Sequence, residues 1–233
     1  MTANTRAARV RPVIAIDGPA GAGKSTLAAY LARQFGFLNL ETGAMYRALA
    51  LKALETGTPL DEPEALTRLM RATEIQLESL GAGNRVLLDG RDVSGRIRDK
   101  DVAEAASRVS VHPAVRAWMV ERQRAMGGQG GVVMEGRDIG TQVFPDAEVK
   151  IFLDAVPEVR GQRRFLQDRQ SGKSLTQEDV IAAVRERDGR DRARAVSPLE
   201  PAADAVLLDT TGLTLEEVCA RAEQLVRARW TGE

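Results

Sequence analysis

The chain has 233 residues, of which 43% are hydrophobic and 28% charged, so it can bury one large core, with or without an inserted subdomain. This composition excludes a disordered chain, a fibrous protein and a disulfide-stapled miniprotein. The 33 basic and 33 acidic residues balance, which argues against an extended nucleic-acid-binding surface. No apolar stretch approaches the roughly 18 residues of a membrane span, and no apolar block follows the arginines near the start. We therefore expect a cytoplasmic protein with neither a membrane nor a nucleic-acid partner.

The chain has one cysteine and one histidine. A single cysteine cannot form an internal disulfide, and the two residues together leave almost no ligands for a zinc site. Cys219 lies on an apolar helix face, which predicts core packing. His112 precedes Pro113 at a helix start, and we expect it to be a bystander.

Short, β-rich apolar runs recur along the chain, and helical patterns separate most of them. The runs cover residues 13–17, 37–40, 132–135, 149–153 and 205–209. Pro157 opens a helix over 157–169, Thr176 begins one over 176–194, and Thr214 with Glu217 forms a capping box. This alternation predicts an α/β fold with a mostly parallel sheet covered by helices.

Residues 61–110 interrupt the alternation. Pro63 opens a short helix, and the runs 74–79 and 85–89 flank Gly-Ala-Gly-Asn at 81–84, a good hairpin turn. The pattern predicts an inserted subdomain. We divide the chain into an N-terminal tail and one domain. The tail covers residues 1–12 and the domain residues 13–233. Within the domain, the core covers 13–60, 111–156 and 195–233, the insertion about 61–110, and a third part about 157–194.

The strongest motif is GPAGAGKS at 18–25, which fits G-x-x-x-x-G-K-[ST] between an apolar strand and an amphipathic helix. Its glycines let backbone N–H groups approach phosphate oxygens, and the helix N-terminus adds a favourable dipole. Lys24 would reach the outer phosphates, and the Ser25 hydroxyl would ligate Mg²⁺. The predicted nucleotide-contacting residues are Gly18, Pro19, Ala20, Gly21, Ala22, Gly23, Lys24, Ser25 and Thr26.

A second polar cluster follows the run 132–135. Glu135, Arg137 and Asp138 stand at the carboxyl end of that strand, where open α/β sheets bind ligands. A carboxylate there could organise magnesium through water, and Arg137 could bind a phosphoryl group. The alternative is a solvated turn with a local Arg–Asp ion pair.

Arginines concentrate in residues 160–194, which carry ten basic and six acidic residues. Arg187, Asp191 and Arg194 are spaced i, i+4, i+7 and share one helix face in the predicted helix, so together they can grip a phosphate and a sugar hydroxyl. The alternative is a helix solvated by alternating charges. An arginine-rich composition can also reflect a GC-rich genome, so only the positions carry weight.

Phosphoryl transfer needs positioning and dispersed positive charge more than a covalent catalyst, so arginine-rich mobile segments favour a kinase. A switch GTPase is excluded because the chain has no N-K-x-D segment, and a motor or helicase would be larger. Two alternatives stay open. One is a P-loop kinase for another acceptor, such as UMP or shikimate, and the other is a nucleotide-binding regulatory module without transfer activity.

Six stretches in this order carry a family resemblance. They are IDGPAGAGKST (16–26), LETGAMYR (40–47), DVSGRIRD (92–99), ASRVSVHPAVR (106–116), EGRDIGTQVFPDAEVKIFLDA (135–155) and RERDGRDRARAVSPLEPAADAVLLDT (185–210). Together they resemble the bacterial cytidylate kinase family, from about Val13 to the C-terminal helix. The resemblance implies a P-loop three-layer α/β fold with a five-stranded parallel sheet. It also implies a monophosphate-binding subdomain in the insertion and a small arginine-rich lid within 157–194.

The resemblance implies ATP-dependent phosphorylation of CMP and dCMP, with ATP and Mg²⁺ required, by a protein we expect to be a monomer. The implied acceptor-binding residues are Thr42, Arg47 and Arg137 for the α-phosphate, Ser107, Arg116 and Asp138 for the cytosine edge, and Arg187 and Asp191 for the ribose hydroxyls. Arg194 would join the phosphates during transfer, so that Lys24, Arg137 and Arg194 form the catalytic set. The lid residues Arg160 and Arg164 would contact ATP.

Two positions depart from the family pattern without changing the functional group. Thr42 stands where serine is also common, and Glu135 stands where aspartate is. The chemistry of cytosine supports its readers independently, because an arginine donor and a carboxylate acceptor match the N3 and O2 acceptors and the N4 donor.

Overall fold

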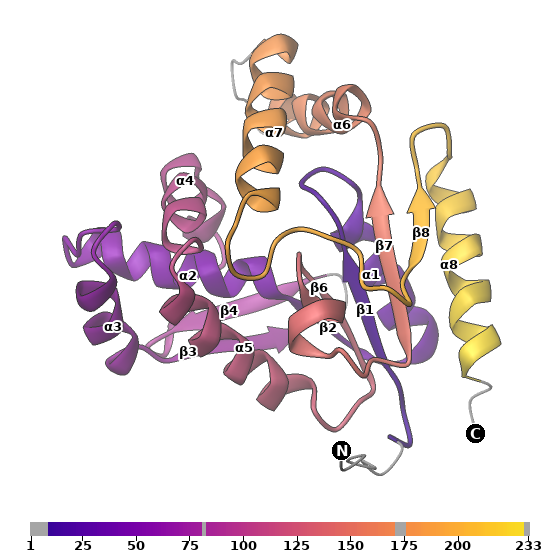
Figure 1. Ribbon diagram of the computed structural model, residues 1–233, viewed down its shortest axis with the longest axis horizontal. Helices are drawn as coiled ribbons and strands as arrows, with labels where there is room; N and C mark the ends of the chain where they lie inside the picture. The colour runs from indigo at the N-terminus through magenta and orange to yellow at the C-terminus, as the bar shows by residue number, and fades with distance from the viewer. Residues whose placement is uncertain (1–8, 81–82, 171–175, 231–233) are drawn as a thin grey trace.

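The computed structural model describes residues 9–80, 83–170 and 176–230. Its centre is a five-stranded parallel sheet in the order β2-β6-β1-β7-β8 (Figure 1). The strands are β1 (Val13–Asp17), β2 (Leu38–Glu41), β6 (Val132–Glu135), β7 (Val149–Asp154) and β8 (Val206–Asp209). The α/β fold class expected from the sequence is confirmed.

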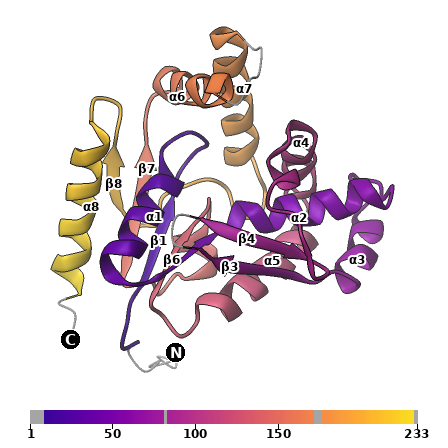
Figure 2. The same cartoon turned by 180° about the vertical axis from the view of Figure 1, so that it is seen from behind.

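Helices cover both faces of this sheet (Figures 1 and 2). Helices α1 (Lys24–Phe35) and α8 (Leu215–Arg229) pack on one face, where Ile14 and Ile16 of β1 lie. The other face, where Val13 and Ala15 lie, packs against the π-helical turn η2 (Ile139–Val143), and η2 contacts α5 (Pro113–Gly127). Side chains of a strand alternate between faces, so the continuous apolar run of β1 fills both cores.

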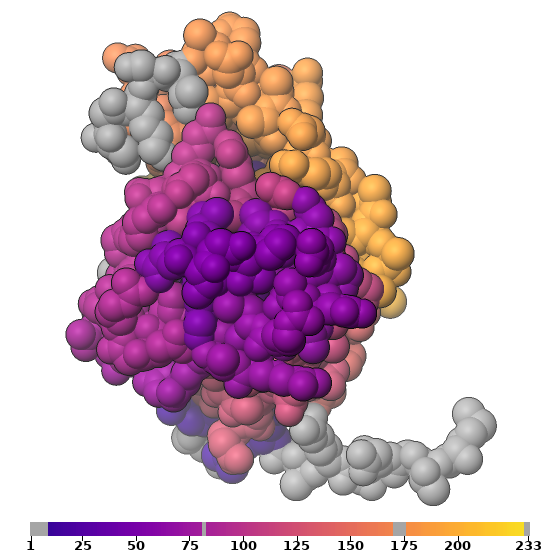
Figure 3. Space-filling model, turned by 90° about the vertical axis from the view of Figure 1, so that its left-hand side faces the viewer, coloured from indigo at the N-terminus to yellow at the C-terminus, as the bar shows by residue number. Residues whose placement is uncertain are grey.

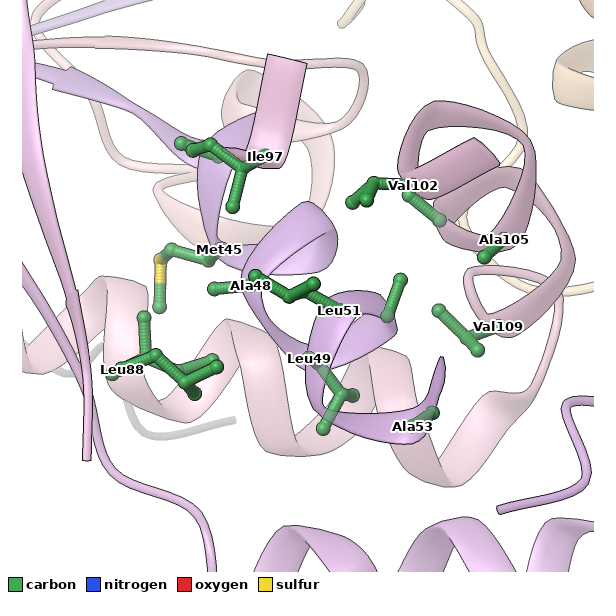
Figure 4. Packing of buried hydrophobic residues seen from close by; sticks show 14 of the residues in the cluster. Met45, Ala48, Leu49, Leu51, Ala53, Leu88, Ile97, Val102, Ala105 and Val109 are labelled. Carbon is green, nitrogen blue, oxygen red and sulfur yellow. The ribbon is translucent and has the colours of Figure 1, made fainter. Parts of the chain in front are cut away.

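The insertion packs beside the sheet around α2 (Thr42–Glu55). Its elements are α3 (Pro63–Arg71), β3 (Ile75–Ser79), β4 (Asn84–Leu88), β5 (Arg91–Asp92), η1 (Arg96–Arg98) and α4 (Lys100–Val109), with β3-β4-β5 forming an antiparallel sheet. Figure 4 shows Met45 of α2 beside Leu88 of β4, with Val102 and Val109 of α4 on the other side of α2. The insertion therefore shares its core with α2, which precedes it in the chain.

One buried side chain ties the insertion to the edge of the main sheet. Asn84, in β4, donates from Nδ2 to the Asn39 carbonyl at 2.6 Å and accepts from the Glu41 backbone N–H at 2.7 Å. An amide side chain offers the same donor and acceptor as a peptide group. Asn84 thus satisfies backbone groups of the edge strand β2 that would otherwise need another strand.

Helices α6 (Pro157–Gln170) and α7 (Gln177–Arg192) pack against each other above the loop that joins β1 to α1. In the space-filling view of Figure 3 the orange α7 region stands above the purple and magenta insertion. Gly161 allows this contact, because a Cβ there would lie 2.4 Å from Cγ1 of Ile181. Within the described ranges no helix has the length and apolar character to cross a membrane.

Most predicted elements are confirmed within a residue. Thr176 caps α7 by accepting from the Asp179 N–H at 3.1 Å, and Thr214 and Glu217 form the reciprocal capping box of α8. Cys219 is buried in the core, and the ring Nε2 of His112 lies 2.8 Å from the Leu60 carbonyl. The predicted hairpin turn falls partly on residues 81–82, outside the described residues, and Asn84 belongs to β4.

Several predicted boundaries are wrong. Phe37 precedes β2, and Glu74 precedes β3. Asp89 lies beyond β4, because it has a left-handed φ of 50° and turns the chain. The helix predicted to reach 194 ends at Arg192, since Leu199 N–H bonds back to the Asp191 carbonyl. Arg194 therefore does not share a helix face with Arg187 and Asp191.

Truncating Leu49 tests whether the α2 cluster stabilises the fold. Leu49 is fully buried, so Leu49→Ala removes apolar contacts and leaves a cavity, which lowers the free energy of unfolding by about 2–5 kcal/mol. Leu54, on the same helix, is 39% exposed, so Leu54→Ala should cost well under half as much. Urea denaturation of both variants measures this, and equal losses would contradict the packing.

Candidate active site

Two cavities meet at the carboxyl edge of the parallel sheet. One, of about 630 Å³, is lined by residues from the loop after β1, α2, α4, α5, the end of β6, α6 and α7. The other, of about 420 Å³, lies between the same loop, α6 and the segment that enters α8. Both are lined by Ala20, Gly21, Lys24, Ser25 and Arg164. The loop thus forms a wall common to both spaces.

The loop owes its shape to its glycines. Gly18, Gly21 and Gly23 have φ of 144°, 78° and 97°, which L side chains rarely adopt. A Cβ on Gly18 would also lie 2.0 Å from the Leu153 carbonyl oxygen. Helix α1 begins directly after these glycines at Lys24, so the free N–H groups of its first turn are available to an anion that binds at the loop.

Lys24 and Glu135 are buried beneath the loop, next to the exposed Ser25. The ammonium of Lys24 donates to the Pro19 carbonyl at 2.7 Å. Burial raises the pKa of Glu135, although Lys24 and a hydrogen bond with Ser25 oppose this shift. Burial, with Arg137 nearby, lowers the pKa of Lys24. Glu135 and Asp17 offset the effect of burial on Lys24 only in part, and a phosphate at the loop would stabilise its charge further.

Asp17 fixes the turn that carries Arg137 and Asp138. As the last residue of β1, it accepts the Ile139 and Gly140 N–H groups at 2.8 and 2.7 Å. Burial raises the pKa of Asp17 to about 6 despite these two hydrogen bonds. The turn after β6 is therefore held by a carboxylate that costs energy to ionise.

Arg116 and Asp138 form a buried ion pair on the wall of the larger cavity. Nη2 of Arg116 lies 2.7 Å from Oδ2 of Asp138, and Nη1 donates to the Ser110 carbonyl at 3.2 Å. The Arg116 guanidinium also lies 5.6 Å from the ring centroid of Tyr46. Ser107, one turn before the end of α4, faces the same space. A charged donor and a charged acceptor thus stand side by side.

Asp191 gathers two arginines across the cavity. Its Oδ2 accepts from Nε of Arg137 at 2.9 Å, and its Oδ1 accepts from Arg194, which also bonds Oγ of Ser110. Burial opposes ionisation of Asp191, but Arg137, Arg194 and Arg187 together hold its pKa below the usual range. Although Arg194 lies beyond α7, this pairing brings it to the site.

Two further arginines are less fully neutralised. Burial and the nearby Arg137 lower the pKa of Arg187 to about 10, and its Nε is a buried donor with no hydrogen-bond partner among the described residues. Arg47 pairs with Glu41, while its Nε likewise lacks such a partner. Unpaired guanidinium donors around one space favour an anionic ligand there.

Of the residues predicted from sequence, most line the cavities. Those lining the larger one are Ala20, Gly21, Lys24, Ser25, Thr42, Arg47, Ser107, Arg116, Arg137, Asp138, Arg164, Arg187, Asp191 and Arg194, and Ala22, Gly23 and Thr26 line the smaller one. Gly18 and Pro19 shape the loop without lining either space. The Thr42 hydroxyl donates to the Glu135 carbonyl at 2.7 Å, which leaves its lone pairs for a ligand donor.

Arg160 does not lie on either cavity, although the family resemblance implied a contact with ATP. It is 1% exposed and is not among the described residues that line the two cavities. Sequence reasoning also gave no role to Glu41, Tyr46, Arg98 and Ser110, which line the larger cavity. All four lie inside the motif stretches, so the motifs marked the segments but not the direction of each side chain.

A glycine-rich loop whose lysine separates two cavities, one rich in arginine, defines a P-loop phosphotransferase. The family model described as cytidylate kinase matches residues 14–228, and the chain belongs to the cytidylate kinase family. The enzyme phosphorylates CMP and dCMP with ATP.

Curated relatives carry the same family name. A cytidylate kinase from Desulfitobacterium hafniense is 53% identical over 208 residues, which cover 89% of each chain. One from Geobacter sp. is 48% identical over 217 residues, covering 93% of each chain. Among solved structures, a shikimate kinase from Acinetobacter baumannii overlaps 94% of this chain and 92% of its own, with 15% identity and a TM-score of 0.45.

The raised pKa of Asp17 predicts a pH dependence of stability. Between about pH 4 and 6 the folded protein holds a proton that the unfolded chain releases, so the contribution of Asp17 to stability is larger at acid pH and falls as pH rises through 6. Asp17→Asn removes this titration. The stability of the parent minus that of the variant should rise by about 1 kcal/mol from pH 7 to pH 5.

Urea denaturation of both proteins at the two pH values measures that difference. Glu121→Gln, which changes an exposed carboxyl on α5, serves as the control for general charge effects. Parallel stability profiles for parent and Asp17→Asn would contradict the buried, proton-binding carboxyl.

Proposed function

We propose that ATP occupies the smaller cavity and the acceptor nucleotide the larger one, with their phosphates meeting at Lys24. The observation that carries this assignment is the shared wall of the two cavities, formed by Ala20, Gly21, Lys24 and Ser25. An in-line transfer needs the donor and acceptor phosphates on one line across such a wall. Arg164 lines both spaces and is the lid arginine suited to ATP.

The acceptor's base would lie against Arg116, Asp138 and Ser107. Cytosine presents acceptors at N3 and O2 and a donor at N4, which match the guanidinium and the carboxylate of the buried pair. Uracil presents the opposite polarity at N3 and at position 4. Its N3–H would face the Arg116 donor, and its O4 would face the Asp138 carboxylate. This match supports cytosine over uracil as the preferred base.

The acceptor's phosphate and sugar would lie nearer the arginines. Arg47 and Arg137, with the backbone N–H of Thr42 at the start of α2, would hold the α-phosphate. Arg187 and Asp191 would hold the ribose hydroxyls, and Arg194 the transferring group. The buried Nε donors of Arg47 and Arg187 support this arrangement. Because the attacking phosphate oxygen is already anionic, these residues need only orient it, and no general base is required.

The residues beside Lys24 fit Mg²⁺. The Ser25 hydroxyl and the Glu135 carboxylate are hard oxygen donors in contact with each other, and Mg²⁺ in such sites takes few protein ligands, with water and phosphate completing its shell. Within the described residues no cluster of three or more His, Cys, Asp or Glu could hold a metal alone. When bound, Mg²⁺ would neutralise phosphate oxygens.

The remaining proposals concern the protein as a whole. Closure of α6 and α7 over the cavities would exclude water and so limit ATP hydrolysis. We further propose a monomer that acts in the cytoplasm on free nucleotides. Sedimentation at micromolar concentration tests the oligomeric state directly.

Removing Lys24 tests the assignment of the loop. Lys24→Ala deletes the charge nearest the junction of the cavities and should lower kcat with CMP by about tenfold to a thousandfold, the scale of one preorganised electrostatic contact. A coupled ADP-release assay measures it, and Lys100→Ala, at an exposed lysine of α4, is the control. Turnover at the parental rate would exclude a catalytic role.

Replacing Arg116 tests the choice of acceptor. Arg116→Met loses a charged hydrogen bond, worth about 1.5–3 kcal/mol, so kcat/KM for CMP should fall by about one to two orders of magnitude. The Kd for ATP should barely change, since Arg116 lines only the acceptor cavity.

Because Arg116 is 2% exposed, the variant must first be shown to fold by its melting temperature. Arg116→Lys keeps the charge and should recover part of the lost efficiency. An acceptor panel of CMP, dCMP, UMP, AMP and shikimate completes the assay. Unchanged CMP efficiency, or equal losses for ATP and CMP, would overturn the base-reading role.

A further inference from the structure

Arg160 is a fully buried guanidinium whose contacts all go to protein groups. It lies in the first turn of α6 and is 1% exposed. Its Nε donates to the Ala155 carbonyl at 2.6 Å, its Nη1 donates to the Ala20 carbonyl at 3.1 Å, and its Nη2 lies 2.6 Å from Oδ2 of Asp188. Buried ion pairs are often no more stabilising than apolar packing of the same volume. Its Nε also lies 3.8 Å from Oδ1 of Asp154, and partners on several segments indicate a positioning role beyond stability.

The contact with Ala20 orients a peptide of the phosphate-binding loop. In a trans peptide the carbonyl of one residue and the N–H of the next point in opposite directions. Arg160 binds the carbonyl of Ala20, so the N–H of Gly21 points away from Arg160. Gly21 also packs on the backbone of α6, because a Cβ there would lie 3.0 Å from the Arg160 carbonyl oxygen. Gly21 lines both cavities, which makes its N–H available to a phosphate.

The contact with Asp188 reaches the acceptor side of the site. Asp188 lies on α7 between Arg187 and Asp191, which line the larger cavity, and it is itself 2% exposed. Neither of its carboxylate oxygens has a hydrogen-bond partner among the described residues, so the ion pair with Arg160 is its principal neutralising contact there. The position of Arg160 thus bears directly on the turn of α7 that carries Arg187 and Asp191.

We propose that Arg160 is a positioning residue that couples the two cavities, so that ATP at the loop tightens binding of the acceptor nucleotide. A phosphate accepting the Gly21 N–H polarises that peptide and strengthens its carbonyl as an acceptor for Arg160. A stronger hydrogen bond to Ala20 fixes the Arg160 guanidinium, which in turn fixes its ion-pair partner Asp188. The turn of α7 that carries Arg187 and Asp191 is thereby fixed as well. By linkage the acceptor tightens ATP binding by the same factor.

The coupling factor is the measurement that tests this proposal, which rests on ATP and CMP occupying the two cavities. It is the ratio of the CMP Kd without and with a saturating non-hydrolysable ATP analogue, measured by calorimetry. In the parent we expect a factor of about 5 to 150, the usual range of such couplings. In Arg160→Met and in Asp188→Asn the factor should fall close to one.

Because a single substitution leaves one buried charge unpaired, the double variant Arg160→Met with Asp188→Leu is also needed. It removes both charges, and it should restore the melting temperature while its coupling factor stays near one. Arg185→Met is the matched control, because Arg185 pairs with Glu158 between the same two helices at an exposed position. This control should keep the parental factor.

The outcomes separate the proposal from the assignment of the cavities. A parent that binds each nucleotide alone, yet shows a factor of one, overturns the coupling and leaves the assignment intact. A parent that binds neither nucleotide overturns both. A parental factor in the double variant, or an equal loss in Arg185→Met, overturns the role of Arg160.

Discussion

All five strands of the parallel sheet end in a carboxylate at the same edge. The terminal residues are Asp17, Glu41, Glu135, Asp154 and Asp209. Asp17 and Glu135 are buried, and a buried carboxylate needs donors or cations around it, which shapes the site. Asp17 takes two backbone N–H groups, Glu41 takes Arg47, and Glu135 lies with Lys24 and Ser25. The turns and helices that supply those donors are thereby fixed above the sheet.

The arginines of the larger cavity depend on the same balance of charge. Arg116 is paired with Asp138, and Arg137 and Arg194 share Asp191. Without these carboxylates the guanidinium groups would repel one another in a poorly solvated space. With them, the positive charges are held in fixed directions, so under the proposed assignment little reorganisation would be needed when phosphate charge shifts during transfer.

The pairing is incomplete, and the incompleteness suits an anionic substrate. Arg187 keeps a lowered pKa of about 10 because burial and Arg137 disfavour its charge, and the pKa of Lys24 is lowered for the same kinds of reason. In the proposed site a bound phosphate would relieve both penalties. Binding free energy would then come from replacing repulsion among buried cations as well as from new hydrogen bonds.

The sequence by itself determined the parts of this protein that depend on neighbours in the chain. The loop after Val13–Asp17 requires glycines at its positive φ positions, and the caps at Thr176 and Thr214 close on residues three positions away. Such contacts can be read from spacing because the chain itself keeps the partners close. The family motifs added which segments meet at the site.

Only the tertiary structure decided where long side chains point within those segments. Arg137 and Asp191 are 54 residues apart, and Asn84 and Asn39 are 45 apart, yet both pairs are hydrogen-bonded. Arg160 and Arg164, one helical turn apart, differ in the same way: one is buried against Asp188 and the other lines both cavities. An arginine side chain reaches in many directions from its backbone, and the carboxylate or carbonyl that is nearest in space selects one of them.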